Sequence, residues 1–220
     1  FKLMPDLSER MRIGGRGMVQ WHRAGVDQRP ADELVQHDVV REVSADGLSV
    51  VYRHRVVVPE ALADLPRVGV RFVLPGRFSA LRWFGRGPHE NYPDRNASAM
   101  LGTWEGGPDE QPYLVPQEFG LRTDVRWLTA TDPGTGDVVR IDVLEPNALH
   151  MSATNVRDHA LFAAANQADL EPGDELVVHL DVAHRGVGTA SCGPDVLPQY
   201  QVAAGEYSFA YRLTVGRARQ

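Results

Sequence analysis

Five segments of the chain alternate apolar and polar residues with a period of two. They are Leu48–Val58, Val68–Leu74, Val138–Leu144, Glu175–Ala183 and Glu206–Val215. Because successive side chains of a strand point to opposite faces, this alternation predicts half-buried antiparallel strands. Turns rich in glycine, proline and aspartate lie between several of them, as in Asp132–Asp137. Short strands separated by such turns predict an all-β sandwich or barrel, and we expect a single domain over residues 1–220.

Helical signals in the chain are few and short. Asp6 and Asp158 each stand before a short stretch without strand periodicity, so each is expected to cap a short helix. Of the four tryptophans, Trp83 and Trp127 fall within strand patterns and are expected in the core, whereas Trp104 is the better candidate for an exposed ring.

Charge and composition narrow the classes of partner. The 220 residues carry a formal net charge of −6, which argues against nucleic acid and anionic membranes as partners. No apolar run is long enough to span a membrane. The single cysteine, Cys192, excludes an internal disulfide and a multi-cysteine metal site, so a reducing cytoplasm is the expected setting. The eight histidines show no metal-ligand spacing.

The stretch Arg82–Arg95, "RWFGRGPHENYPDR", combines a strand with a polar turn. A strand is expected to end at Phe84, after which Gly85, Gly87, Pro88 and Pro93 restrict the backbone and predict a rigid loop. The polar side chains that this loop would display are Glu90, Asn91, Tyr92, Asp94 and Arg95. Two interpretations remain open. The loop is either a surface that meets a sugar or another domain, or a corner whose side chains bind its own backbone groups.

The motif WFGRGPHENYPDR resembles the signature of the C-terminal domain of family 2 β-galactosidases, also called the small chain. Further blocks that resemble the family follow in order: YLVPQEFGLRTDVRWL, HLDVAHRGVGTASCGPD and AAGEYSFAYRL. The opening FKLMPDLSER is similar to the part that follows an Asp-Asn-Asp block of the family, so we expect the chain to begin inside the domain. The resemblance covers nearly the whole chain.

The resemblance implies an N-terminally truncated antiparallel supersandwich, similar in fold to galactose mutarotase. It implies a neighbouring (β/α)₈ barrel that carries the two catalytic glutamates, so no catalytic residue is expected here and the chain alone should be inactive. The whole enzyme would hydrolyse terminal β-galactosides with retention and form a homo-oligomer. Mg²⁺ and Na⁺ are expected in the other domains, with no cofactor bound by this part.

The resemblance also implies which residues line the sugar pocket. A tryptophan of the family's late loop corresponds to Cys192 here, between Ser191 and Gly193, and Phe1 would lie beside the same pocket. Loss of the ring removes a stacking platform and widens the site. The alternative for Cys192 is a buried, small apolar residue, which is common for cysteine.

Other interpretations of the same residues stay open. A mutarotase-like epimerase would need a histidine and a carboxylate facing one cavity, for which His54, His184 and Glu90 are candidates. A carbohydrate-binding module would stack sugar on Trp104 and Tyr92, and a structural assembly domain would do neither. His179 and Asp181 point to one face of a strand, and a histidine–aspartate pair of this kind either serves acid–base chemistry or, as we expect here, anchors a loop through hydrogen bonds.

The region from Val35 to Glu42 is short, since the family usually has a further hairpin there. Its absence would leave a sheet edge unprotected.

Overall fold

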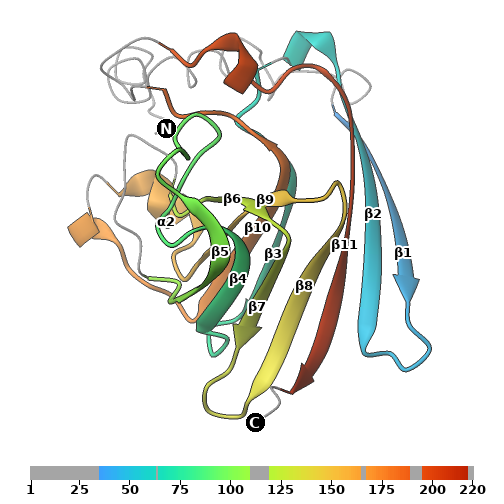
Figure 1. The fold of residues 1–220 in the computed structure, drawn as a ribbon, viewed down its shortest axis with the longest axis vertical. Helices are drawn as coiled ribbons and strands as arrows, with labels where there is room; N and C mark the ends of the chain where they lie inside the picture. Colours follow the sequence, from blue (N-terminus) through green and yellow to red (C-terminus); the bar gives the residue numbers. More distant parts are fainter. Residues whose placement is uncertain (1–34, 63, 110–118, 165–166, 189–194, 218–220) are drawn as a thin grey trace.

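The chain folds as two antiparallel sheets packed face to face (Figure 1). The computed structural model describes residues 35–62, 64–109, 119–164, 167–188 and 195–217. Within these ranges it has eleven strands. The predicted all-β sandwich is therefore confirmed. No helix in the described ranges is long and apolar enough to cross a membrane.

The larger sheet has seven strands in the order β1-β2-β11-β8-β7-β4-β5. Their bounds are Gln36–Val43 for β1, Ser49–Val58 for β2, Gly205–Arg217 for β11, Asp137–Glu145 for β8, Trp127–Thr131 for β7, Ala80–Gly87 for β4 and Met100–Gly106 for β5. The final strand of the chain thus lies near the middle of the sheet, where it pairs with both β2 and β8.

The smaller sheet has four strands in the order β3-β10-β9-β6. Their bounds are Arg67–Pro75, Glu175–His184, Leu149–Thr154 and Arg122–Val125. One short helix, α2, spans Asp158–Ala163, and single 3₁₀ turns lie at Glu60–Leu62, Gln167–Asp169 and Pro198–Tyr200. The helix predicted near Asp158 is present, but Arg157 holds the cap position and Asp158 is its first helical residue.

The core lies between the two sheets and is built from the inward faces that the sequence predicts. Buried apolar side chains from both sheets meet there, among them Val56, Val58, Val68, Ile141, Leu176, Val178, Leu180 and Phe209. Each comes from a strand whose other face carries polar residues. The alternation in the sequence therefore specifies which face of these strands meets the core, although on β10 the opposite face is buried too, at Val177 and Asp181.

The glycines of the Arg82–Arg95 stretch belong to a strand and not to a loop, which corrects one expectation. Strand β4 runs on to Gly87, where it pairs with Met100 of β5. A Cβ atom added at Gly87 would lie 2.6 Å from the nearest ring atom of Trp104. The glycine is required because the indole ring packs directly over the strand, and the turn begins only at Pro88.

Trp104 and Trp127 occupy environments that differ from those expected. Trp104 is half-buried, and its indole Nε1 donates a hydrogen bond to the carbonyl oxygen of Gly85 over 3.2 Å. Trp127 lies on the outer face of β7, where the guanidinium carbons of Arg140 and Arg82 are 4.7 and 5.9 Å from its ring centre. Trp83 is buried in the core as expected.

His54 is a buried imidazole within an aromatic stack on β2 and β11. Its ring lies 4.5 Å from Phe209 and 5.5 Å from Tyr211, measured between centroids. Its Nδ1 atom is 2.9 Å from Nε2 of His37 on β1. Burial, with a smaller contribution from His37, lowers the pKa of His54 from its ordinary value to about 4. The residue is therefore neutral in the folded chain near neutral pH.

This buried imidazole should make the stability of the chain depend on pH. Between about pH 6.5 and pH 4, the unfolded chain binds a proton at His54 that the folded chain does not bind, so the free energy of unfolding should fall as the pH falls. His54→Phe keeps a ring in the stack and should show a shallower fall, as measured by urea unfolding followed by tryptophan fluorescence. Parallel curves for the two proteins would contradict the assignment.

Candidate functional site

The turn after β4 is tied to the interior by Asn91, which is fully buried. Its Oδ1 accepts hydrogen bonds from the backbone N–H and the hydroxyl of Thr123, over 3.0 and 2.5 Å. Its Nδ2 donates to the carbonyl oxygen of His89, and its backbone N–H donates to Leu121. One side chain thereby fixes the turn against the strand β6 that follows it in sequence by about 30 residues.

Glu90 is a buried carboxylate that is held by three hydrogen-bond donors. Its Oε2 accepts from the backbone N–H of Gly120 over 2.9 Å and from the hydroxyl of Tyr92 over 3.1 Å. Its Oε1 accepts from the guanidinium of Arg95 over 3.0 Å. Burial raises the pKa of Glu90, and these donors and the nearby Arg122 partly oppose that rise. Its hydrogen bonds hold the turn to Gly120, just before β6.

Tyr92 connects the turn with the end of β10. Its side chain is completely buried, with the Arg95 guanidinium carbon 4.9 Å from its ring centre and the His184 ring 6.1 Å away. A fully buried ring cannot stack on a sugar, so Tyr92 does not provide the platform that a carbohydrate-binding module would need.

Asp94 binds the start of the late glycine-rich loop. Its carboxylate accepts hydrogen bonds from the backbone N–H groups of Val187 and Gly188, over 3.0 and 2.7 Å. Gly186 fits against this carboxylate so closely that a Cβ atom there would lie 2.6 Å from Cγ of Asp94. The turn thus holds a loop more than 90 residues away in the sequence.

Arg185, which directly precedes this loop, binds two aspartates, one of which directly follows residues 189–194. The guanidinium is buried and is bound by Asp64 through contacts of 2.7 and 3.1 Å, and by Asp195 through one of 2.7 Å. Asp195 lies directly after residues 189–194, and Arg185 lies a few residues before them. Cys192, Ser191 and Gly193 fall in that segment, outside the described residues. Phe1, at the start of the chain, also lies outside them.

These contacts show where the residues of the predicted loop lie. Gly87 ends β4, Pro88 and Pro93 lie in the turn, and the polar side chains from Glu90 to Arg95 point mainly inward. These side chains bind backbone groups, as the second interpretation predicted. Most of those backbone groups belong to residues 120–123 and 187–188, however, and few belong to the turn itself. We call Glu90, Asn91, Tyr92, Asp94 and Arg95, with the backbone that they hold, the anchor cluster.

The anchor cluster has little capacity for chemistry of its own. The carboxylates of Glu90 and Asp94 already accept the hydrogen bonds described above, so neither is poised as a free general base. Among the described residues, no group of three histidine, cysteine or carboxylate side chains could hold a metal ion. The cluster is suited to positioning other segments.

A second polar group, which the sequence did not predict, lies on the outer face of the smaller sheet. His179 Nδ1 is 3.2 Å from the Ser152 hydroxyl, and its Nε2 is 3.5 Å from Asp158, which also binds Arg71 over 2.7 Å. The hydrogen bond to His179 is the main cause of the lowered pKa of Asp158. Ser152 is buried within β9 and not on an exposed turn, so the group is better suited to holding α2 against the sheet than to nucleophilic catalysis.

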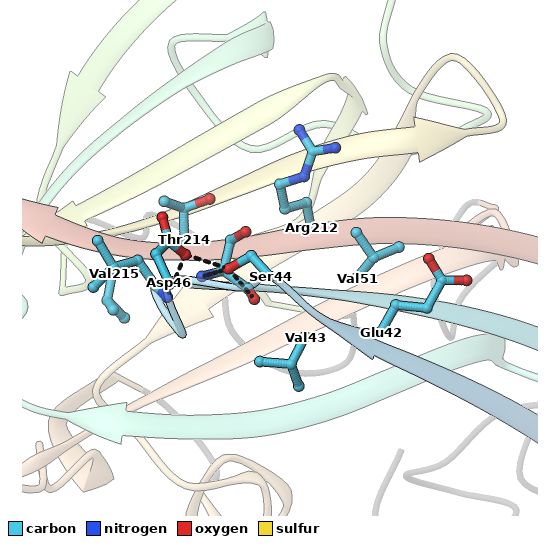
Figure 2. A pocket seen from close by; sticks show the side chains of 10 residues that line it. Glu42, Val43, Ser44, Asp46, Val51, Arg212, Thr214 and Val215 are labelled. Atoms are coloured by element: carbon cyan, nitrogen blue, oxygen red, sulfur yellow. Dashed lines mark hydrogen bonds between the residues drawn. The ribbon is translucent and has the colours of Figure 1, made fainter.

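A shallow hollow of about 510 Å³ lies at the hairpin between β1 and β2 (Figure 2). Glu42, Ser44, Asp46, Val51, Arg212 and Thr214 are among its lining residues. Asp46 accepts hydrogen bonds from the Ser44 hydroxyl and the Leu48 N–H, so its carboxylate mainly shapes the hairpin. None of the lining residues belongs to the anchor cluster.

Comparison with known proteins shows to which family this chain belongs. A family model described as "Beta galactosidase small chain" matches residues 10–213, which is most of the chain. The chain belongs to this family. The match includes the anchor cluster and the late loop that it holds.

Relatives of the small chain include much longer proteins. A β-galactosidase from Arthrobacter sp. is 32% identical over 225 aligned residues that take in 84% of this chain. One from Vibrio cholerae is 36% identical over 73% of the chain, and one from Priestia megaterium is 38% identical over 59%. The chain spans only 12% to 22% of the length of these three relatives.

Asn91 should contribute strongly to the stability of the small chain. Asn91→Ala removes the acceptor from the buried N–H of Thr123, so the free energy of unfolding should fall by about 2–3 kcal/mol. Urea unfolding would measure this, with His89→Ala as the control because the His89 side chain is exposed. Equal stability of the two variants would show that the bonds of Asn91 are dispensable.

Proposed function

We propose that this small chain is the C-terminal part of a β-galactosidase that hydrolyses terminal β-D-galactosides with retention, and that it forms one wall of the sugar pocket. The anchoring of residues 186–188 and 195 by Asp94 and Arg185 carries this proposal. The buried guanidinium of Arg185 and the partly buried carboxylates of Asp94 and Asp195 hold the two ends of one loop, whereas surface loops are usually mobile. A rigid base is what a loop needs in order to hold a substrate in one orientation.

Catalysis itself belongs to another part of the polypeptide in this proposal. A retaining glycosidase needs two carboxyl groups about 5–5.5 Å apart, one as nucleophile and one as acid and base. Glu90 and Asp94 serve as hydrogen-bond acceptors within the fold and are unsuited to those roles. The catalytic glutamates would lie in a barrel domain, together with any Mg²⁺ and Na⁺. The cytoplasm is the proposed location, and a homo-oligomer the proposed assembly.

The segment between the anchors would supply the contact with sugar. Ser191, Cys192 and Gly193 would line the pocket, with Phe1 beside it. A thiol in place of an aromatic ring offers no stacking face and leaves more room, so we propose weaker binding of the leaving sugar and tolerance of bulky acceptors.

The proposed division of labour can be tested with a chromogenic β-galactoside. The 220-residue chain alone should give no hydrolysis above the rate in buffer, whereas the whole polypeptide or the chain co-expressed with its large chain should be active. Hydrolysis by the chain alone would overturn the assignment of catalysis to another domain. Failure of the whole polypeptide on every β-galactoside tested would overturn the proposed activity.

Asp94 should act as a positioning residue in the whole enzyme. Asp94→Asn keeps the size of the side chain but leaves a single acceptor oxygen for two N–H groups, so KM should rise about tenfold with a smaller change in kcat. Glu105→Gln is the control, because Glu105 is an exposed carboxylate paired with Arg82 on the sheet. Loss of thermal stability with KM unchanged would assign Asp94 a purely structural role.

A further inference from the structure

Asp64, which lies shortly before β3, has an unusual backbone conformation. Its φ angle is 68°, in the left-handed region that residues other than glycine seldom adopt. Its backbone N–H donates to the carbonyl oxygen of Val202 over 2.6 Å, and the neighbouring Leu65 forms a β-bridge with Val202. The surrounding structure therefore holds Asp64 in this conformation, and positions held in this way are frequent at functional sites.

Further backbone hydrogen bonds join this segment to the end of β10 and to the end of the chain's last turn. The N–H of Arg185 donates to the carbonyl oxygen of Pro66 over 2.9 Å, and the N–H of Gly186 donates to that of Tyr200 over 2.9 Å. Main-chain contacts thus fix three segments that are distant in sequence. A charged side chain that begins on such a support starts from a fixed backbone, as its precise orientation requires.

The carboxylate of Asp64 fixes the plane of the buried Arg185 guanidinium. Its Oδ1 accepts a hydrogen bond from Nε over 2.7 Å and its Oδ2 accepts one from Nη2 over 3.1 Å. A bidentate pair of this kind fixes orientation as well as distance. Only 8% of the arginine side chain and 13% of the aspartate side chain are exposed, so water competes little for these bonds.

The same Nη2 atom connects Asp64 with a second carboxylate. It also donates to Oδ1 of Asp195 over 2.7 Å, and Asp195 follows directly after residues 189–194. Because Nη2 carries two hydrogens in a rigid plane, the bonds to Asp64 determine where the other hydrogen points. Rotation of the guanidinium away from Asp64 would turn this donor away from Asp195. The two carboxylates are therefore coupled through one nitrogen atom.

We propose that Asp64 is a positioning residue for the wall of the sugar pocket, and that it acts through Arg185 on Asp195. This rests on the proposed function, which assigns the late loop to that wall. Asp64 holds the guanidinium in the orientation that binds the far end of the loop. Asp94 holds the near end through backbone N–H groups, so each end of the loop has its own support.

Steady-state kinetics of the whole enzyme on a chromogenic β-galactoside test the role of the carboxylate. Asp64→Asn keeps the size of the side chain, and asparagine tolerates the left-handed backbone, so the change removes mainly the charge and one acceptor. KM should rise about fivefold and kcat should change less than about twofold, because the wall orients the substrate and takes no part in the reaction. Glu60→Gln is the control, since Glu60 is an exposed carboxylate in the same part of the chain.

A glycine variant separates the effect of the carboxylate from that of the backbone. Asp64→Gly relieves the strain of the positive φ angle but also removes the carboxylate, so KM should rise at least as much as in Asp64→Asn. A normal KM in the glycine variant would show that the carboxylate has no positioning role and would overturn the inference.

A double-mutant cycle tests whether Asp64 and Asp195 act through the same guanidinium. If they do, the effects of Asp64→Asn and Asp195→Asn on KM should overlap, and the double variant should resemble the single variant with the higher KM. Two independent residues with fivefold effects would instead raise KM about 25-fold. Such multiplication, or a KM that ignores Asp64 in an active enzyme, would contradict the inference alone. An unmodified enzyme that hydrolyses no β-galactoside would instead contradict the proposed function.

The folding of the variants decides the remaining case. Tryptophan fluorescence during urea unfolding should show that Asp64→Asn and Asp64→Gly are folded under the conditions of the assay. If neither variant folds, the group serves folding and not positioning, and the inference is wrong.

Discussion

Buried backbone N–H groups that have no strand partner place the strongest constraint on this sandwich. The N–H groups of Gly120 and Thr123 are buried and those of Val187 and Gly188 are partly buried, and an N–H shielded from water without an acceptor is costly. Glu90, Asn91 and Asp94 supply the acceptors from a single turn. The turn therefore joins parts of the chain that the strand pairing alone would leave unconnected.

The same contacts explain why so polar a turn has little exposed chemistry. Charged groups are tolerated inside a fold when they are paired or hydrogen-bonded, and Glu90, Asp94 and Arg185 all meet this condition. A carboxylate used in this way holds geometry and leaves proton transfer to other groups. This fits the division of labour proposed above, in which another domain would perform the reaction.

The anchor cluster and β1 differ in how far their side chains are covered. At the anchor cluster, Glu90 is buried, and the carboxylates of Glu90 and Asp94 accept hydrogen bonds from backbone N–H groups of neighbouring segments. At β1, by comparison, Val39 and Val43 are exposed, and none of the described strands pairs with its outer edge.

The sequence by itself determined the strands with clear alternation, their core-facing sides and the family, because period-two alternation and a dense motif are local properties of the chain, whereas β1, β5, β6 and β9 lack such a signal and were not predicted. Even there, local reasoning ended β4 too early, since the ring of Trp104 that packs over Gly87 comes from another strand. It also placed Trp127 in the core, whereas the register of β7 turns that ring outward between two arginines.

Only the tertiary structure decided what the polar turn binds. Asp94 meets Val187 and Gly188 across more than 90 residues, and His179 meets Ser152 and Asp158 where Asp181 was the nearer candidate in sequence. Hydrogen bonds of this kind depend on which strands become neighbours. That choice is made by the packing of two whole sheets and is not encoded in any one segment.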